Sequence, residues 1–200
     1  TKEPQNFQNS KYKYSYGATL PHTKKRKKIA SQKSKKSAQP TVWIKFEATS
    51  RTRPNGKVYF LDKRFPAERT SFSASKKPRR IAEGDLVYIA VHSYDATGHP
   101  APMIVACAKA HKFSENNFLS EEKEWPYYIE LYDLKVLPGP LQDGLSLYTL
   151  IDICGKNTYK HTQTKDKDID IKYSHRQQAY LELAEPAQNY LHEYFESKLE

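Results

Sequence analysis

Positive charge is concentrated at one end of this chain of 200 residues, and this limits what each part of the chain can fold into. Residues 1–40 carry 11 Lys and Arg side chains against one acidic residue, Glu3, a balance equal to the net charge of the whole chain, +10. Residues 41–200 hold 22 basic and 22 acidic residues, so their charge sums to zero. We therefore expect a basic, flexible tail or linker over residues 1–40 and one folded domain over residues 41–200.

The basic tail is typical of a segment that binds a polyanion without reading its sequence, because each neutralised phosphate releases counterions. The tail has no apolar periodicity, and its densest run of charge supplies five candidate phosphate contacts: Lys24, Lys25, Arg26, Lys27 and Lys28. The chain has no initiator Met, its only Met being Met103, so we expect it to be cut from a longer polypeptide. Discrimination between ligands must then come from residues 41–200.

The hydrophobic pattern of residues 41–200 predicts a mixed α+β, mostly β fold. Two helices are expected, a short one capped by Ser146 and a second over residues 185–198. The expected strands begin near Val42 and cover residues 57–61, 86–92, 103–111, 125–136 and 177–183. Such short strands with long loops favour a small β-barrel with a few flanking helices. Residues 62–80 and 93–102 are expected to be loops, and residues 51–80 hold ten basic residues against two acidic ones.

Motifs that would indicate an enzyme are not found in this sequence. It contains no Gly-rich phosphate loop, no nucleophile elbow and no Cys/His set with zinc spacing. We therefore predict no catalytic residue, no metal and no cofactor. The two cysteines, Cys107 and Cys154, favour buried thiols in a reducing, cytoplasmic compartment. No stretch approaches the roughly 20 apolar residues of a membrane helix, and no signal peptide is visible at the N-terminus.

Three groups of aromatic side chains could line a pocket. Trp43 lies on the strand face opposite Val42, Ile44 and Phe46. Tyr88 and His92 share one side of the strand over residues 86–92, and Trp125 precedes Pro126 and two tyrosines. Each aromatic could equally belong to the core. For Trp43 this would mean that its strand is buried on both faces.

Two of these segments resemble the EVE-type branch of the PUA-like superfamily. Trp43-Ile44-Lys45-Phe46 opens the domain, and Arg80-Ile81-Ala82-Glu83-Gly84-Asp85-Leu86-Val87-Tyr88-Ile89 carries the second motif. The run from Ile104 to Ala108 and the segment from His175 to Leu183 are also similar to that branch, so the resemblance covers most of residues 41–195. It implies a small barrel with an aromatic pocket that takes up a modified base flipped from duplex DNA. Such domains are often fused to nucleases that cut modified DNA, which implies the specificity module of a modification-dependent restriction system.

The resemblance, taken residue by residue, gives two sets of candidate site residues. The base-pocket candidates are Trp43, Ser50, Tyr88, His92 and Trp125. The phosphate-contact candidates in the folded domain are Arg51, Arg53, Arg79 and Arg80, since Arg pairs with phosphate in a bidentate manner. These arginines could equally lie in a solvated loop. The expected partner is nucleic acid, DNA rather than RNA, together with a fused or associated nuclease and no membrane.

Two other classes of function remain open at this stage. The chain could bind RNA, or be a nuclease whose catalytic residues are scattered along the sequence. It could also be a protein–protein interaction module with a basic tail, because residues 111–200 carry 16 acidic residues against ten basic ones. The base or modification, the choice between DNA and RNA, and the oligomeric state are not predicted.

Overall fold

The fold was derived from a computed structural model of the chain, which divides into two units, Thr1–Ser37 and Ala38–Glu200. The structure describes residues 39–47, 50–52, 58–60, 64–74, 78, 80–114, 127–164, 171 and 180–200. All of these residues belong to the second unit, so the predicted tail lies outside the described residues.

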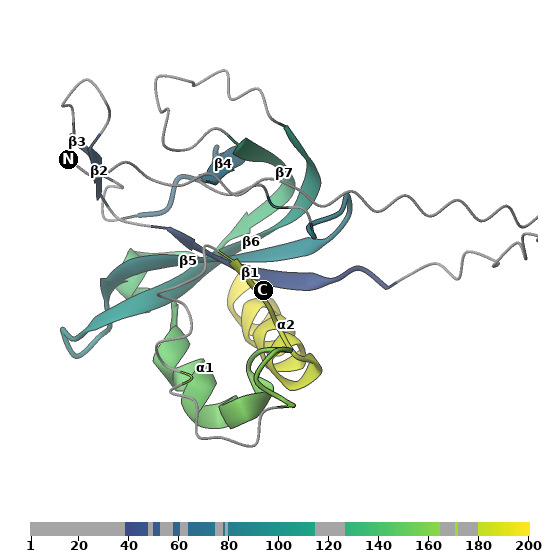
Figure 1. The fold of residues 1–200 in the computed structure, drawn as a ribbon. Coiled ribbons are helices and arrows are strands. Elements are labelled where there is room, and N and C mark those ends of the chain that lie inside the picture. The colour runs from purple at the N-terminus through teal and green to yellow at the C-terminus, as the bar shows by residue number, and fades with distance from the viewer. Residues whose placement is uncertain are drawn as a thin grey trace, which may run out of the picture. The chain divides into compact units, whose positions relative to one another are not determined.

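The second unit is built on one mixed sheet, shown in Figure 1. Its strands are β1 (Val42–Glu47), β4 (Ser71–Ala74), β5 (Leu86–Tyr94), β6 (Pro100–Ser114), β7 (Tyr127–Val136) and β9 (Tyr180–Glu182). They are arranged in the order β4-β7-β6-β5-β1-β9, and the short β8 (Leu145–Ser146) pairs with β6. β2 (Ser50–Thr52) and β3 (Val58–Phe60) form a separate antiparallel pair.

All six residues of strand β1 are buried, and both of its edges are paired, in parallel with β5 and antiparallel with β9. Val42, Ile44 and Phe46 face the core between the sheet and the helices, whereas Trp43 belongs to a second apolar cluster with Val87 and Ile89. A strand in a parallel pairing is commonly covered on both faces. Of the two interpretations of Trp43, the structure therefore agrees with burial.

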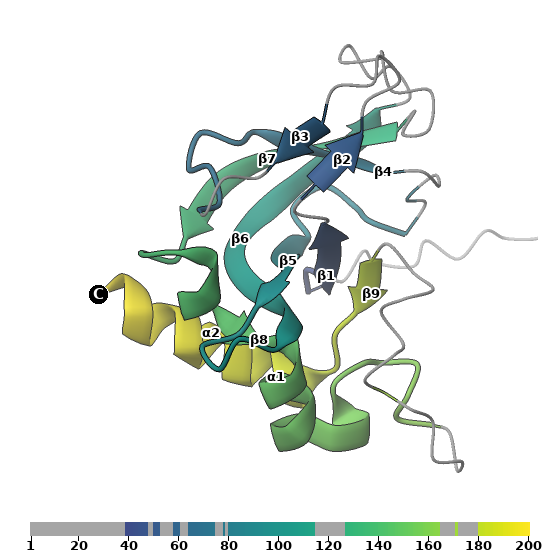
Figure 2. The same ribbon diagram turned by 90° about the vertical axis from the view of Figure 1, so that its left-hand side faces the viewer.

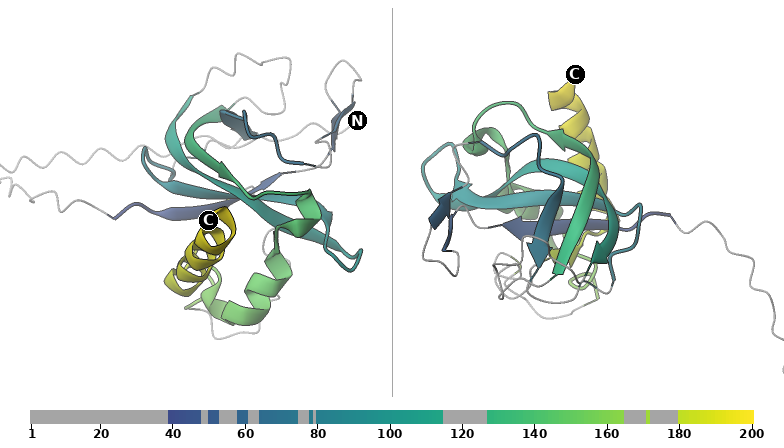
Figure 3. Two further views of the ribbon diagram at one scale, coloured as in Figure 1. Left: turned by 180° about the vertical axis from the view of Figure 1, so that it is seen from behind. Right: turned by 90° about the horizontal axis from the view of Figure 1, so that it is seen from above.

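Helices cover one face of the sheet. α1 (Leu147–Cys154) and α2 (Glu185–Leu199) lie together beneath it in Figure 1 and in the rear view of Figure 3. The Ser146 side chain accepts a hydrogen bond from the Tyr148 amide and so caps α1, as predicted. In α2, Ala187, Leu191 and Phe195 recur at helical spacing and are all buried against the sheet, which confirms the second predicted helix. Two short 3-10 helices, η1 (Leu141–Asp143) and η2 (Gly155–Asn157), flank α1.

Irregular pairing curves the long strands, as Figure 2 shows for β6. The register shifts once between β5 and β6, and twice between β6 and β7. Asp133, on β7, lies at one of these irregularities with a φ of 52°. Since a bulge adds a residue to one strand and increases its twist, β7 and β4 bend over the face that carries Trp43.

Gly144 permits the close approach of the segment before α1 to the sheet. A Cβ atom at this position would lie 2.7 Å from the carbonyl oxygen of Ile104. Any residue with a Cβ atom would therefore require the neighbouring backbone to move.

Three sequence predictions are corrected by the structure. The sheet is not closed into a barrel, because its edge strands β4 and β9 are not paired with each other within the described residues. Residues 62–80 are not all loop, since β4 lies there and pairs with β7. The loop expected over residues 93–102 is a tight hairpin in which β5 reaches Tyr94 and β6 starts at Pro100. Its turn is closed by Asp95, whose side chain accepts hydrogen bonds from Thr97 and from the His99 amide.

Candidate nucleic-acid interface

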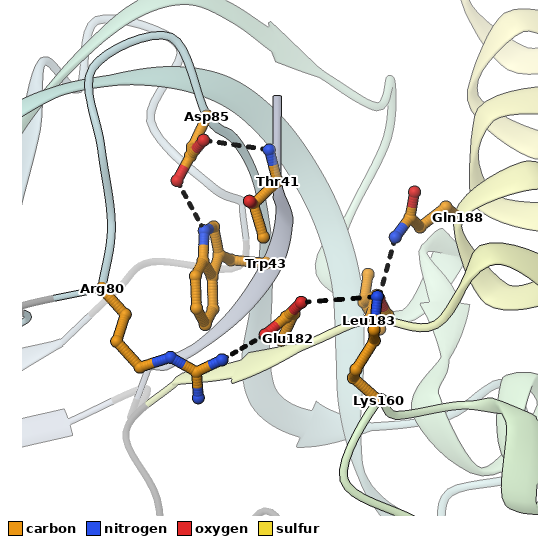
Figure 4. A network of polar contacts seen from close by, with 8 residues as sticks. All are labelled: Thr41, Trp43, Arg80, Asp85, Lys160, Glu182, Leu183 and Gln188. Atoms are coloured by element: carbon orange, nitrogen blue, oxygen red, sulfur yellow. Dashed lines mark hydrogen bonds and ion pairs between the residues drawn. The ribbon is translucent and has the colours of Figure 1, made fainter. Parts of the chain in front are cut away.

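A buried carboxylate joins the two segments that carry the family resemblance. Asp85 is 5% exposed and accepts three hydrogen bonds. Its Oδ2 lies 2.9 Å from the indole Nε1 of Trp43 and 2.9 Å from the Ala82 amide, and its Oδ1 lies 3.0 Å from the Thr41 amide. Gly84, with a φ of 88°, makes the tight turn that brings this carboxylate to the start of β1. Asp85 therefore fixes both the turn before β5 and the orientation of Trp43 (Figure 4).

The ring of Trp43 is covered by side chains from two other segments. Tyr180 on β9 meets it edge-on, with ring centroids 5.8 Å apart. The guanidinium carbon of Arg80 lies 5.2 Å from the ring centroid, within the range of a cation–π contact. Trp43 is consequently only 2% exposed, and Arg80, at 70% exposure, stands between it and the solvent.

Arg80 also belongs to an ion-pair network at the edge of the sheet. Its Nη2 donates to Oε2 of Glu182, and Lys160 Nζ lies 3.9 Å from Oε1 of the same carboxylate. Glu182 is the register partner of Trp43 across the β1–β9 pair. Figure 4 shows Trp43, Arg80 and Glu182 side by side, with Lys160 on the next segment. Of the phosphate-contact candidates, Arg80 thus lies at the surface next to Trp43.

A second charged cluster lies farther along β1, buried on the same face as Trp43. Lys45 and Glu47 are 1% and 2% exposed, and their charged groups are 3.6 Å apart. Arg69 Nη1 lies 2.9 Å from the other oxygen of Glu47. Lys45 Nζ also donates to the carbonyl oxygen of Phe46 at 2.6 Å. The guanidinium of Arg69 in turn lies 5.6 Å from the ring of Phe65.

The sequence prediction did not include this cluster among the site residues, although the alternation of β1 contained the signal. Lys45 and Glu47 occupy the same strand face as Trp43, two and four residues further on. Charged residues are rarely buried unless they are paired. Trp43, Lys45, Glu47 and Arg69 are therefore the strongest candidates for a ligand site on this face.

Tyr88 does not lie beside Trp43. It pairs in register with Ile44, whereas Trp43 pairs with Val87, so the two rings are on opposite faces of the sheet. Tyr88 packs edge-on against Phe195 of α2, with ring centroids 5.1 Å apart. Burial, with smaller contributions from the neighbouring Cys107 and Glu196, raises the pKa of its hydroxyl far above the usual range. The structure thus places Tyr88 in the core between the sheet and the helices, and one pocket cannot be lined by both Tyr88 and Trp43.

His92 lies on β5 one residue beyond Val91, which is the register partner of Glu47 at the end of β1. Its side chain is exposed, and the structure does not bring it to Trp43. Ser50 and Arg51 lie on β2, but their side chains are outside what the structure describes. The remaining candidates lie outside the described residues: Trp125, Arg53, Arg79, Lys24, Lys25, Arg26, Lys27 and Lys28.

The described residues contain no group of three or more His, Cys, Asp or Glu side chains that could hold a metal ion. No helix in the same part of the chain combines the length and apolar composition needed to cross a bilayer. Both cysteines are free thiols, and burial raises the pKa of Cys107 to about 11. A scan against protein families gives no match, and a search of curated proteins also gives none.

Proposed function

We propose that this chain is a nucleic-acid-binding module that reads a modified base in DNA, as the specificity module of a modification-dependent restriction system. The charge distribution supports a polyanionic partner, because residues 1–40 carry the whole excess of positive charge and residues 51–80 add a second basic region. Phosphate contacts of this kind give affinity and position, and contacts to base edges give specificity.

The observation that carries the base-reading part of the proposal is the row of side chains on one face of β1. Trp43, Lys45 and Glu47 follow one another on this face, and Arg69 pairs with Glu47 at its end. An ammonium group and a guanidinium only donate hydrogen bonds, and a carboxylate only accepts them. A base edge presents donors and acceptors side by side, so this row offers the complementary groups within a few ångströms.

Energetic reasoning supports a ligand role for the charged cluster. Buried ion pairs are weak evidence for stability, since apolar residues of similar volume often stabilise a fold equally well or better. Within this proposal, the buried charges of Lys45 and Glu47 serve to recognise a polar ligand. Within this proposal, Lys45 and Glu47 read the base edge, and Ser50, His92 and Trp125 stay predictions.

The same proposal includes the resemblance to the EVE-type branch of the PUA-like superfamily. The Trp43–Asp85 hydrogen bond supports it, because it joins the Trp-led strand and the Gly-Asp turn that carry the resemblance. A closed barrel is not part of the proposal, since the sheet is open in the described residues. A catalytic activity would then belong to a nuclease, fused or associated, that acts on the DNA held by this module.

The test is binding of the full chain to DNA duplexes that differ only in one base. They would be unmodified or carry 5-methylcytosine, 5-hydroxymethylcytosine or N6-methyladenine. The basic tail contributes equally to all four complexes, so a difference between them isolates the folded unit. We expect a preference of about tenfold or more for one modification, which is about 1.4 kcal/mol. Equal affinity for all four duplexes would overturn the proposal, and tighter binding to RNA would move the target to RNA.

Matched variants identify the residues that read the base. Glu47→Gln keeps the shape of the side chain and removes the negative charge, so we expect it to reduce the preference while salt-dependent binding persists. Glu196→Gln is the control, because Glu196 pairs with Lys135 on the exposed side of α2. If Glu47→Gln retains the full preference in a folded protein, the assignment of Glu47 to base reading is wrong.

A further inference from the structure

Glu182 holds two exposed cations in one place at the edge of the sheet. Arg80 pairs with its Oε2, and Lys160 Nζ lies 3.9 Å from its Oε1. Arg80 is 70% exposed and Lys160 is 65% exposed, whereas Glu182 is only 18% exposed. A single carboxylate thus occupies the position between a guanidinium and an ammonium group that both face the solvent.

The backbone fixes this arrangement from both sides. The Lys160 amide donates to the carbonyl oxygen of Glu182 at 3.0 Å, and Glu182 lies opposite Trp43 in the β1–β9 pair. Arg80 precedes Ile81, which is buried, and Ala82, whose amide donates to Asp85. The two cations therefore start from fixed segments, and their separation does not depend on Glu182 alone.

We propose that Arg80 and Lys160 form a binding site for a backbone phosphate of DNA, and that the carboxylate of Glu182 occupies the phosphate position until DNA displaces it. This rests on the proposed function, since it assumes a nucleic-acid ligand. A phosphate presents paired oxygens to Arg as a carboxylate does, and it accepts further hydrogen bonds from Lys. Exposed ion pairs contribute little to stability, so exchanging the carboxylate for a phosphate costs little.

Binding of a phosphate to Arg80 should change the surroundings of the Trp43 indole ring. Arg80 covers the indole ring at 5.2 Å while it pairs with Glu182 (Figure 4). When its guanidinium turns to a phosphate, the environment of the indole changes. The site lies at the rim of the face that carries Trp43, Lys45 and Glu47, so a phosphate bound here would position a nucleotide next to that row.

Neutralising Glu182 provides the test. Because its carboxylate competes with the DNA phosphate for Arg80 and Lys160, removing its charge should strengthen DNA binding. Glu182→Gln and the control Glu196→Gln change the net charge equally, but Glu182→Gln removes the shared partner of Arg80 and Lys160, whereas Glu196→Gln removes the partner of Lys135. The full chain would be titrated with a short unmodified DNA duplex at several salt concentrations. We expect Glu182→Gln to bind about two- to fivefold more tightly than Glu196→Gln, as expected from removing a competing surface ion pair.

Arg80→Gln provides the opposite perturbation. We expect it to reduce the slope of log affinity against log salt by about 0.9, the value for one phosphate contact on duplex DNA. In ¹H–¹⁵N spectra, the Trp43 indole signal, assigned from its loss in Trp43→Phe, should shift on titration of the wild type with the duplex. In Arg80→Gln this shift should be lost.

Two results would overturn the phosphate site: equal affinities of Glu182→Gln and Glu196→Gln, or an unchanged salt slope in Arg80→Gln. If the variants show the expected effects but the wild type has no preference among modified duplexes, the phosphate site stands and the proposed function is wrong. If it shows a preference without these effects, the proposed function stands and the phosphate site is wrong. A wild type that does not bind DNA would overturn both.

Discussion

The hydrogen bonds of Asp85 predict a large loss of stability when its charge alone is removed. Three donors converge on this carboxylate, from Thr41, Trp43 and Ala82. A hydrogen bond to a charged group contributes about 1.5–3 kcal/mol. In Asp85→Asn one oxygen remains, which can still accept from Trp43 and Ala82, but the new amide group directs its own N–H groups at the Thr41 amide.

One bond is therefore lost and two become neutral, and we expect Asp85→Asn to lower the free energy of unfolding by about 2–3 kcal/mol. Asp133→Asn is the matched control. Asp133 is exposed and has a φ of 52°, which Asn also tolerates, so its effect should stay within about 0.5 kcal/mol. Urea titration followed by circular dichroism measures both values.

A double-mutant cycle separates the Trp43 bond from the other two. Trp43→Phe removes the indole donor and leaves an aromatic ring between Arg80 and Tyr180. We expect a coupling energy of about 1–2 kcal/mol between Trp43→Phe and Asp85→Ala, because the alanine removes the acceptor and the residues share a buried hydrogen bond. The reasoning is refuted if Asp85→Asn is as stable as Asp133→Asn, or if the coupling energy is zero.

Four further predictions concern the core, the cysteines and the hairpin. Phe195→Ala should destabilise the protein by about 3–5 kcal/mol in urea titration, because the ring is buried between α2 and the sheet, and a loss below 1 kcal/mol would contradict this packing. Burial raises the Cys107 pKa from 9.0 to about 11, so the protonated thiol is favoured in the folded state and stability should fall as the pH rises from 9 to about 11. Under native conditions the half-buried Cys154 should be alkylated before Cys107, as mass spectrometry would show, and the reverse order would contradict the assigned burial. Hydrogen bonds, above all from the Thr97 side chain, lower the pKa of Asp95. Asp95 therefore stabilises the hairpin fully above its usual pKa, and this stabilisation is lost as the pH falls through the lowered value. Amide exchange in the turn would measure this pH dependence, and Asp95→Ala should remove it.

Local sequence patterns were sufficient to predict most elements of the sheet and both helices. The alternation in β1, the Gly84 turn and the Ser146 cap each depend on residues close together in the chain, and the structure agrees with all three. β4 was missed because Ser71–Ala74 has no apolar run of its own and becomes a strand by pairing with β7. Pairing of this kind depends on tertiary contacts, which override local propensity.

The sequence alone could not show which pocket candidates lie on the same face of the sheet, for a geometric reason. Alternation shows which residues share a face of one strand, but the register between β1 and β5 decides which faces coincide. In the observed register Tyr88 pairs with Ile44, and a shift of one residue would have placed it beside Trp43. Burial of Lys45 and Glu47 was likewise unexpected, because it depends on segments that cover the second face of the sheet.

The two motif residues Trp43 and Asp85 have a structural role in this chain. Trp43 and Asp85 are buried together, and each is engaged by the other. Their hydrogen bond joins β1 to the turn before β5 and so fixes the position of β1. Within the proposed function, specificity is assigned to side chains that share this face without being needed to form it. Lys45 and Glu47 meet that condition, because a buried ion pair can be replaced by apolar residues without loss of the fold. Replacing Lys45 and Glu47 together by apolar residues should therefore change ligand preference with little loss of stability, whereas removing one of the two charges, or changing Trp43 or Asp85, should lower stability first.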